Sequence, residues 1–274
     1  MIPPIVDVDW WLARREQVVT ADVRFYLDGR SARAAYDAGH IPGAVFVDLA
    51  GRLATHGAPA DGRHPLPSPE DFAAGMSAAG IGDGDVVVAY DDTGGTTAAR
   101  LVWMLRALGH DAALLDGGLA AFAGELETAE SVRPPATFTA RPWPADRLAT
   151  IDDAAAAGAA AVVLDARDLA RYTGEVEPVD PQAGHIPGAR SLPCREHLTE
   201  SGRFVGVDAL RERFAAVGVT AGADVISYCG SGVTACHNLL ALEHAGLGPG
   251  RLYPGSWSAY SNTPDRPVAT GESP

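Results

Sequence analysis

The sequence of 274 residues is short of several features that would assign it to a common class of protein. Its three cysteines, Cys194, Cys229 and Cys236, form no Cys-x-x-Cys pair and no Cys/His spacing typical of a zinc site. The odd number, with no signal-like N-terminus, argues against a disulfide scaffold. No apolar run reaches the roughly 18 residues of a membrane span. We therefore expect a cytoplasmic protein without a metal site.

Positive charge is also scarce in this chain. There are 21 Lys and Arg residues against 35 Asp and Glu residues, which gives a formal net charge of −14. No run is rich in Lys or Arg, so nucleic acid and anionic membranes are not expected as partners. A small anionic substrate stays compatible, because it needs only a local cationic pocket.

The strongest chemical signal lies around Cys229. An apolar run that ends at Ile226 predicts a buried strand, and Val233–Ala245 has helical spacing. The small residues between them predict a loop in which backbone N–H groups and the positive end of a helix face one sulfur. Cys229 is therefore a candidate nucleophile of low pKa. The alternative is a buried structural cysteine at a strand end.

The chain also contains an internal repeat, longer than the periods of solenoid proteins. The segment His40–Ala44 recurs as His185–Ala189, and three further pairs of segments, one upstream and two downstream, occur in the same order in both copies. These pairs are Leu27–Arg30 with Leu164–Arg167, Val88–Asp91 with Ile226–Cys229, and Asp116–Gly118 with Pro254–Ser256. The offset rises from 137 for the Leu27–Arg30 pair to 145 for the His40–Ala44 pair, which predicts about eight extra residues between Arg167 and His185 in the second copy.

The repeat predicts two domains and a connector. We place the first domain at residues 1–126, a Pro-rich linker at 127–149 and the second domain at 150–274. The tail from Ser261 has three prolines and little apolar content, so we expect it to be loosely ordered.

Each copy alternates short apolar runs with segments of helical spacing. A cap at Ser68 predicts a helix start, and Thr96–Leu108 and Val207–Val217 have helical spacing. The predicted strands are Val23–Asp28, Val86–Tyr90, Ala112–Leu115, Val162–Asp165, Val225–Tyr228 and Arg251–Tyr253. This alternation predicts an α/β fold with a mostly parallel sheet covered by helices on both faces in each copy. Sites in such sheets lie at the carboxyl ends of strands, where Cys229 falls.

On these motifs the chain resembles the rhodanese family, and specifically its tandem-domain sulfurtransferases, over nearly its whole length. The resemblance implies two rhodanese-like domains, with a silent first copy that has Asp91 at the cysteine position and a second copy that carries Cys229. Thiosulfate-preferring members have basic residues just after the cysteine. Here Gly230 and Ser231 follow it, and this neutral loop is similar to that of the 3-mercaptopyruvate sulfurtransferases.

The activity implied by the resemblance is sulfur transfer through a persulfide on Cys229, with no cofactor. The donor would be 3-mercaptopyruvate, and the acceptor a thiol, such as that of thioredoxin, or cyanide. The loop residues Gly230, Gly232, Val233 and Thr234 would hold the sulfur and donor. Thiosulfate as the donor and a relay module fed by a protein persulfide remain as alternatives. We expect a monomer or homodimer, with one site between the two copies.

Three further residues gain roles from the resemblance. Ser231 would relay a proton, and His64 would act as an acid or base near neutral pH. Arg171 would bind the donor's carboxylate with two hydrogen bonds. Their alternatives are a turn residue, a capping or surface histidine and a surface helix residue. Relatives often carry a second arginine where this chain has Val179, so one carboxylate contact is predicted to be missing.

The remaining candidates favour structural roles. His40 and His185 occupy the same motif position in the two copies, and His40 belongs to the silent copy. Each is therefore expected to brace a loop. Cys194 is expected to be semi-exposed and non-essential, and Cys236 to pack in the core, with a resolving thiol as the alternative. A phosphatase loop needs an arginine six residues after the cysteine, where this chain has Ala235, so phosphoryl transfer is excluded.

Overall fold

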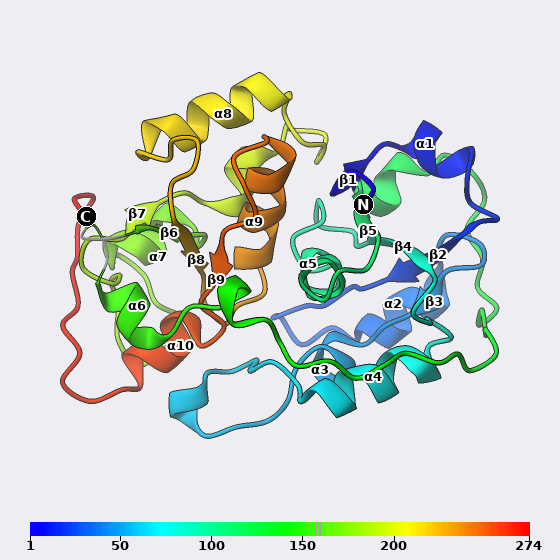
Figure 1. The fold of residues 1–274 in the computed structure, drawn as a ribbon, viewed down its shortest axis with the longest axis horizontal. Coiled ribbons are helices and arrows are strands. Elements are labelled where there is room, and N and C mark those ends of the chain that lie inside the picture. Colours follow the sequence, from blue (N-terminus) through cyan, green and yellow to red (C-terminus); the bar gives the residue numbers. More distant parts are fainter. Residues whose placement is uncertain (157, 159–160) are drawn as a thin grey trace. The chain divides into compact units, whose positions relative to one another are not determined.

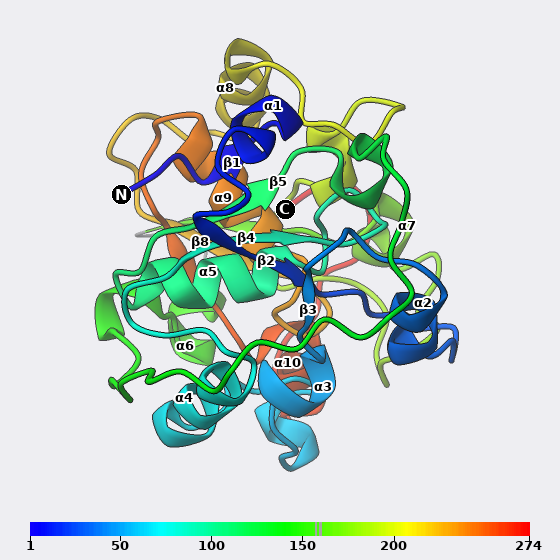
Figure 2. The same ribbon diagram turned by 90° about the vertical axis from the view of Figure 1, so that its right-hand side faces the viewer.

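The computed structural model describes residues 1–156, 158 and 161–274, and these fall into two compact units (Figures 1 and 2). The first unit comprises residues 1–55, 66–143 and 200–204, and the second comprises 56–65, 144–199 and 205–274. The predicted linker is thus divided, since it belongs to the first unit up to Trp143 and to the second from Pro144. Residues 56–65, predicted in the first domain, group with the second unit.

The first unit is built on a five-stranded sheet in the order β1-β5-β4-β2-β3, in which every neighbouring pair is parallel. Its strands are β1 (Ile5–Val6), β2 (Val18–Asp22), β3 (Val45–Phe46), β4 (Val86–Tyr90) and β5 (Ala112–Leu115). Its helices are α1 (Val8–Leu12), α2 (Ala32–Ala38), α3 (Leu49–Arg52), α4 (Pro69–Ala78), α5 (Ala99–Ala107) and the 3₁₀ turn η2 (Gly118–Ala121).

Alternation along β4 explains why this sheet is covered on both faces. Val88 and Tyr90 pack in a core with Trp11 of α1, whereas the intervening residues face the side on which α5 packs. Figure 2 shows α1 and α5 on opposite sides of the strands. The predicted cap is also present, because the Ser68 hydroxyl accepts the Asp71 N–H and a proline opens α4.

The second unit holds a four-stranded parallel sheet in the order β7-β6-β8-β9. Its strands are β6 (Val162–Asp165), β7 (Arg190–Ser191), β8 (Val225–Tyr228) and β9 (Arg251–Leu252). Its α-helices are α6 (Ile151–Ala155), α7 (Leu169–Thr173), α8 (Val207–Ala216), α9 (Ala235–His244) and α10 (Ser256–Ser261), and its 3₁₀ turns are η1 (Pro59–Asp61), η3 (Ala145–Arg147) and η4 (Cys194–His197). Figure 1 shows α8 and α9 on one side of this sheet and α6 and α10 on the other.

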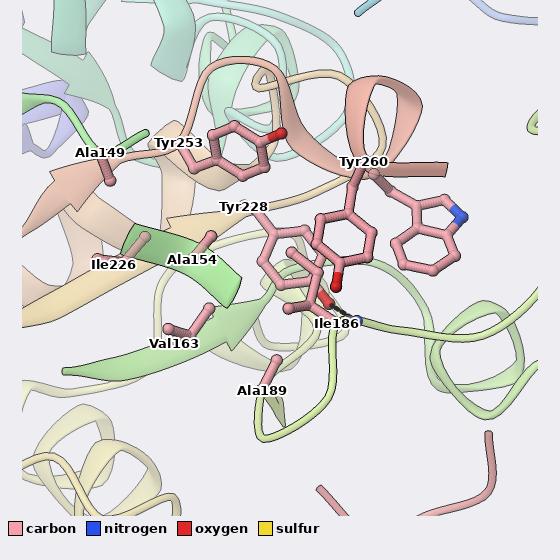
Figure 3. Close-up of a cluster of buried hydrophobic side chains, with 10 residues drawn as sticks. Ala149, Ala154, Val163, Ile186, Ala189, Ile226, Tyr228, Tyr253 and Tyr260 are labelled. Carbon is pink, nitrogen blue, oxygen red and sulfur yellow. Dashed lines mark hydrogen bonds between the residues drawn. The ribbon is translucent and has the colours of Figure 1, made fainter. Parts of the chain in front are cut away.

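A buried core joins the sheet of the second unit to α6 and α10 (Figure 3). Its ten buried members are Ala149, Ala154, Val163, Ile186, Ala189, Ile226, Tyr228, Tyr253, Trp257 and Tyr260. The Tyr228 hydroxyl accepts a hydrogen bond from the Ile186 N–H at 3.2 Å, drawn as the dashed line in Figure 3. The strand that leads to Cys229 is therefore anchored at its last residue.

The structure corrects the predicted first strand. The strand is Val18–Asp22, not Val23–Asp28, because the β-branched, fully buried run comes earlier and the chain leaves the sheet after Asp22. Leu27 is 72% exposed in the turn that follows. The counterpart of Asp165–Arg167 is consequently Asp22–Arg24, and each arginine is ion-paired with its aspartate, at 2.7 Å in the first copy and 2.6 Å in the second.

This pairing also revises the predicted insertion of about eight residues. The aspartate and the repeated histidine are 18 positions apart in the first copy (22 to 40) and 20 apart in the second (165 to 185). The extra length falls after Tyr172, which lies 13 positions before His185, whereas Tyr36 lies 4 before His40. Residues 173–184 therefore form an excursion specific to the second copy.

The repeated histidines have the bracing role that the sequence predicts. His40 stacks on Tyr36 and His185 on Tyr172, in both cases with ring centroids 3.7 Å apart and planes 8° apart. Nδ1 of each histidine is within 2.9 Å of the tyrosine's carbonyl oxygen. Both rings are fully buried, so each closes the loop that follows the helix.

The C-terminal tail differs from the loosely ordered segment that its composition predicts. Ala269 forms an antiparallel bridge with His185, with N–H···O distances of 2.9 and 3.0 Å, and the Gly271 N–H reaches the Thr173 carbonyl at 2.8 Å. Main-chain hydrogen bonds need no particular side chain, which explains why composition did not predict them. Among the described residues, no helix is long and apolar enough to cross a membrane.

Candidate active site

Cys229 lies at the carboxyl end of β8, in a loop that leads into α9. Its side chain is buried, and Sγ accepts a hydrogen bond from the Gly232 N–H at 3.1 Å. The left-handed φ of +74° at Gly232, favourable for glycine, turns this N–H back toward the sulfur. The ten-residue helix α9 begins just beyond, at Ala235, so the positive end of its dipole also faces the loop.

The start of α10 holds the cysteine loop from the other side. The Ser256 hydroxyl accepts the Cys229 N–H at 3.1 Å, and the Cys229 carbonyl accepts the Trp257 N–H at 2.9 Å. The Gly230 carbonyl accepts the Ser258 N–H at 2.9 Å. The loop is therefore fixed by backbone contacts that do not depend on the identity of its own side chains.

The equivalent loop of the first copy shows what this turn can bind. Asp91 stands at the cysteine position, fully buried, at the end of β4. Its carboxylate accepts the N–H groups of Thr93, Gly95, Thr97 and Ala98 at 2.7–2.9 Å, together with the Thr97 hydroxyl at 2.8 Å. The turn is thus a cradle of backbone donors for a negative group.

The structure brings His64 and Ser231 together. His64 Nδ1 lies 2.7 Å from Ser231 Oγ, and the tautomer of the imidazole decides which atom donates. The segment that carries His64 is fastened to α10, because the Arg63 N–H donates to Ser258 Oγ at 3.1 Å. Gly62, with φ of +89°, lies so close that an added Cβ would be 2.6 Å from the Gly255 carbonyl oxygen.

Arg171 lies beside the cysteine loop but is already ion-paired. Its guanidinium contacts Glu177 at 2.6 Å and Asp180 at 3.1 Å, and its side chain is only 16% exposed. A Cβ built on Gly230 would lie 3.4 Å from Arg171 Nη1. The residue is therefore adjacent to Cys229 rather than on an open helix surface.

Three charged residues of the site were not found from the sequence: Arg63, Glu177 and Asp180. Arg63 forms an ion pair with Asp180, and a Cβ on Gly230 would be 2.9 Å from Arg63 Nη2. Burial raises the pKa of Asp180, although both arginines act to lower it. Burial also acts to raise the pKa of Glu177, but hydrogen bonds from Arg171 and the Asp180 N–H lower it. The one available signal was that Arg63 directly precedes His64.

Val179 occupies the position where a second arginine was expected, and its side chain is 45% exposed. It lines a cavity of about 370 Å³ together with Arg63 and Asp180. Cys229 is not among the residues that line this cavity. The cavity therefore lies where the expected arginine side chain would extend, next to the charged side chains of Arg63 and Asp180.

The other two cysteines are buried in the core. Cys194 was expected to be semi-exposed, but it is only 5% exposed, at the start of η4. That expectation was wrong because the Cys194 N–H donates to the Ala166 carbonyl at 3.1 Å, which holds the residue beside the sheet. Burial, and next the charge of Cys229, raises the pKa of the Cys194 thiol to about 12. Cys236 donates its S–H to the Gly232 carbonyl at 3.3 Å. Within the described residues, no cluster of three or more His, Cys, Asp or Glu residues could hold a metal ion.

Comparison with known proteins identifies the family. The model of the Rhodanese-like domain matches residues 8–125 and 148–263. A probable 3-mercaptopyruvate sulfurtransferase of Pseudomonas aeruginosa is 44% identical over 270 residues, covering 93% of each chain. A putative thiosulfate sulfurtransferase of Mycobacterium tuberculosis is 40% identical, covering 93% of this chain and 92% of the other. The crystal structure of the 3-mercaptopyruvate sulfotransferase SseA of Escherichia coli matches with a TM-score of 0.82 and 32% identity, over 93% of this chain and 99% of that one.

The chain belongs to the rhodanese family and carries two rhodanese-like domains. It is a sulfurtransferase. The predictions of the family, of the α/β fold and of the enzyme class are confirmed. A sulfurtransferase needs a sulfur donor and an acceptor, and Cys229 in its loop of backbone donors is the candidate carrier between them.

Proposed function

We propose that this chain transfers sulfur from 3-mercaptopyruvate to a thiol acceptor through a persulfide on Cys229. The observation that carries the proposal is the loop itself, because the equivalent turn in the first copy holds a carboxylate with four backbone N–H groups. A turn of this kind stabilises a thiolate and then the outer sulfur of a persulfide. The names of the relatives in Pseudomonas and Escherichia support this donor.

In the first half-reaction the Cys229 thiolate attacks the thiol sulfur of the donor. A sulfur–sulfur bond forms, the carbon–sulfur bond breaks, and its electron pair leaves on the enolate of pyruvate. The proton that was on the donor's sulfur ends on the enolate carbon. The pair of Ser231 and His64, 2.7 Å apart, is placed to carry that proton, since imidazole exchanges protons near neutral pH.

In the second half-reaction an acceptor thiolate attacks the outer sulfur of the persulfide. The sulfur–sulfur bond of the persulfide breaks, and its electron pair returns to Cys229 as a thiolate. A thiol protein such as thioredoxin fits this role, and cyanide serves as an acceptor in an assay. The first copy has a fixed carboxylate at Asp91 in place of a thiol, so we propose that it is catalytically silent.

The charge of the loop supports 3-mercaptopyruvate over thiosulfate as the donor. Gly230 and Ser231, the two residues that follow the cysteine, add no positive charge to the loop. A dianion such as thiosulfate would gain little in this neutral setting. The alternative of thiosulfate rests on the name of the Mycobacterium relative.

Paired steady-state kinetics test the proposal, with 3-mercaptopyruvate and thiosulfate as donors and with cyanide and then a dithiol as acceptors. We expect kcat/KM to favour 3-mercaptopyruvate by at least about tenfold, which is about 1.4 kcal/mol of transition-state preference. A preference for thiosulfate would contradict the argument from loop charge. Turnover with neither donor would favour a relay module that receives its sulfur from another protein.

A further inference from the structure

Two guanidinium groups converge on a single peptide, that of Gly230, directly after Cys229. A Cβ on Gly230 would lie 2.9 Å from Arg63 Nη2 and 3.4 Å from Arg171 Nη1. Arg63 comes from the segment before His64, and Arg171 comes from α7, so the two cations reach this place from distant parts of the sequence.

A carboxylate already lies between these two cations. Asp180 directs Oδ1 to Arg63 and Oδ2 to Arg171, the second contact at 3.1 Å. The Asp180 side chain is 2% exposed, so the ion pairs are shielded from water. The pair of arginines therefore has the spacing needed to hold one carboxylate with both of its oxygens.

The two acidic residues of this cluster are held differently. Glu177 is fixed by the N–H groups of Val179 and Asp180, both at 3.0 Å, and by Arg171. The carboxylate of Asp180 has side-chain hydrogen bonds to the two arginines. It also borders the cavity of about 370 Å³ lined by Val179.

Arg63 has a further donor to offer. Its Nε is buried and has no hydrogen-bond partner among the residues that the structure describes. A buried N–H without an acceptor costs free energy, and a second acceptor oxygen at this place would remove that cost.

We propose that Arg63 and Arg171 form one carboxylate-binding site, which Asp180 fills in the absence of substrate and from which the donor's carboxylate displaces it. The proposal rests on the proposed function for the identity of the ligand, a small 2-oxo acid. Arg63 then supplies the second guanidinium, which relatives often carry at the position of Val179. Because Asp180 has to be displaced, the apparent affinity for the donor equals the intrinsic affinity multiplied by the fraction of molecules in which the site is free of Asp180.

The first test measures binding without catalysis. Pyruvate is titrated by calorimetry into Cys229→Ser protein that also carries a second substitution. We expect Arg63→Met to weaken pyruvate binding by about tenfold or more, as for the loss of a hydrogen bond between charged groups, and Arg63→Lys to weaken it less. Asp180→Asn should tighten binding several-fold, because the internal competitor loses its charge. Arg14→Met, an exposed arginine of the first unit, is the matched control.

The second test is kinetic and uses the chain with Cys229 intact. Arg63→Met and Arg171→Ala should each raise KM for 3-mercaptopyruvate more than they lower kcat, and Val179→Arg should partly restore KM in the Arg63→Met background. Unchanged pyruvate binding and unchanged KM in Arg63→Met would overturn the proposal, as would weaker binding in Asp180→Asn. If no donor turns over but pyruvate binding still depends on Arg63, the proposed function fails while the carboxylate site stands.

Discussion

At the scale of single residues, the proposed mechanism depends on one of the three sulfur atoms. Cys229 is the thiol in the loop of backbone donors, whereas Cys194 and Cys236 are buried in the surrounding core. The cysteine loop could be predicted from the sequence because its strand, glycines and helix are contiguous. Arg63 and Asp180 could not, since they are 117 positions apart and no spacing pattern encodes such a contact.

We expect Cys229→Ser to abolish turnover, because a hydroxyl is neither ionised at neutral pH nor able to carry sulfur. Cys194→Ser and Cys236→Ser should retain most of the activity. Steady-state kinetics check this, with thermal melting alongside, since a buried hydroxyl without a partner costs about 1–3 kcal/mol. Mass spectrometry after donor treatment should find one added sulfur in all proteins except Cys229→Ser. Substantial turnover in Cys229→Ser would remove Cys229 from the mechanism.

At the scale of elements, the second unit places a histidine between helices. His197 of η4 lies 5.2 Å from the Phe214 ring of α8 and 6.1 Å from the His237 ring of α9, between ring centroids. Burial, and next the charge of His237, lowers the pKa of His197 from 6.5 to about 3. The folded state therefore requires the neutral imidazole, whereas the unfolded chain binds a proton below pH 6.5.

The stability contributed by neutral His197 is complete above pH 6.5 and is lost as the pH falls from 6.5 toward 3. The slope approaches about 1.4 kcal/mol per pH unit, because the unfolded chain binds one more proton than the folded one. Urea denaturation at several pH values, compared with His197→Gln, measures it. Parallel curves for the two proteins across this range would contradict the assignment.

The elements also show where sequence patterns succeed and fail. Five of the six predicted strands lie within a residue of the observed bounds, because each is a short apolar run that ends in a loop. The first strand was misplaced because Val23–Asp28 resembles an apolar strand as much as Val18–Asp22 does. Val18–Asp22 is the strand because it pairs with β3 and β4. Pairing between distant strands is invisible to local periodicity.

At the scale of the whole molecule, the two copies hold different side chains in equivalent loops. In the first copy the carboxylate of Asp91 satisfies four backbone N–H groups. In the second copy the equivalent loop brings one backbone N–H, that of Gly232, to the Cys229 sulfur. The duplication could be read from the sequence, whereas the assignment of residues 56–65 to the second unit could not, because it depends on contacts with α10.

Asp91→Ala should therefore destabilise the chain by about 3 kcal/mol or more, since several buried N–H groups lose a charged acceptor. Asp91→Asn should cost less, because it keeps one acceptor oxygen. Cys229→Ser should cost less than Asp91→Ala, because the new hydroxyl can still accept the Gly232 N–H. Chemical denaturation of the three variants provides the comparison. Equal stabilities for Asp91→Ala and Cys229→Ser would show that the first loop does not depend on its carboxylate.

The hydrogen bonds that hold the Asp91 carboxylate also indicate how strongly the second loop can bind sulfur and still release it. A carrier that turns over has to release its cargo, so every donor that steadies a captured atom also delays its departure. The first loop, closed around its own side chain by backbone donors and a threonine hydroxyl, is a permanently saturated version of this turn. On the proposed mechanism, catalysis in the second loop is therefore a compromise between binding the sulfur and releasing it, and a weaker hold on sulfur than the first loop has on Asp91 favours turnover.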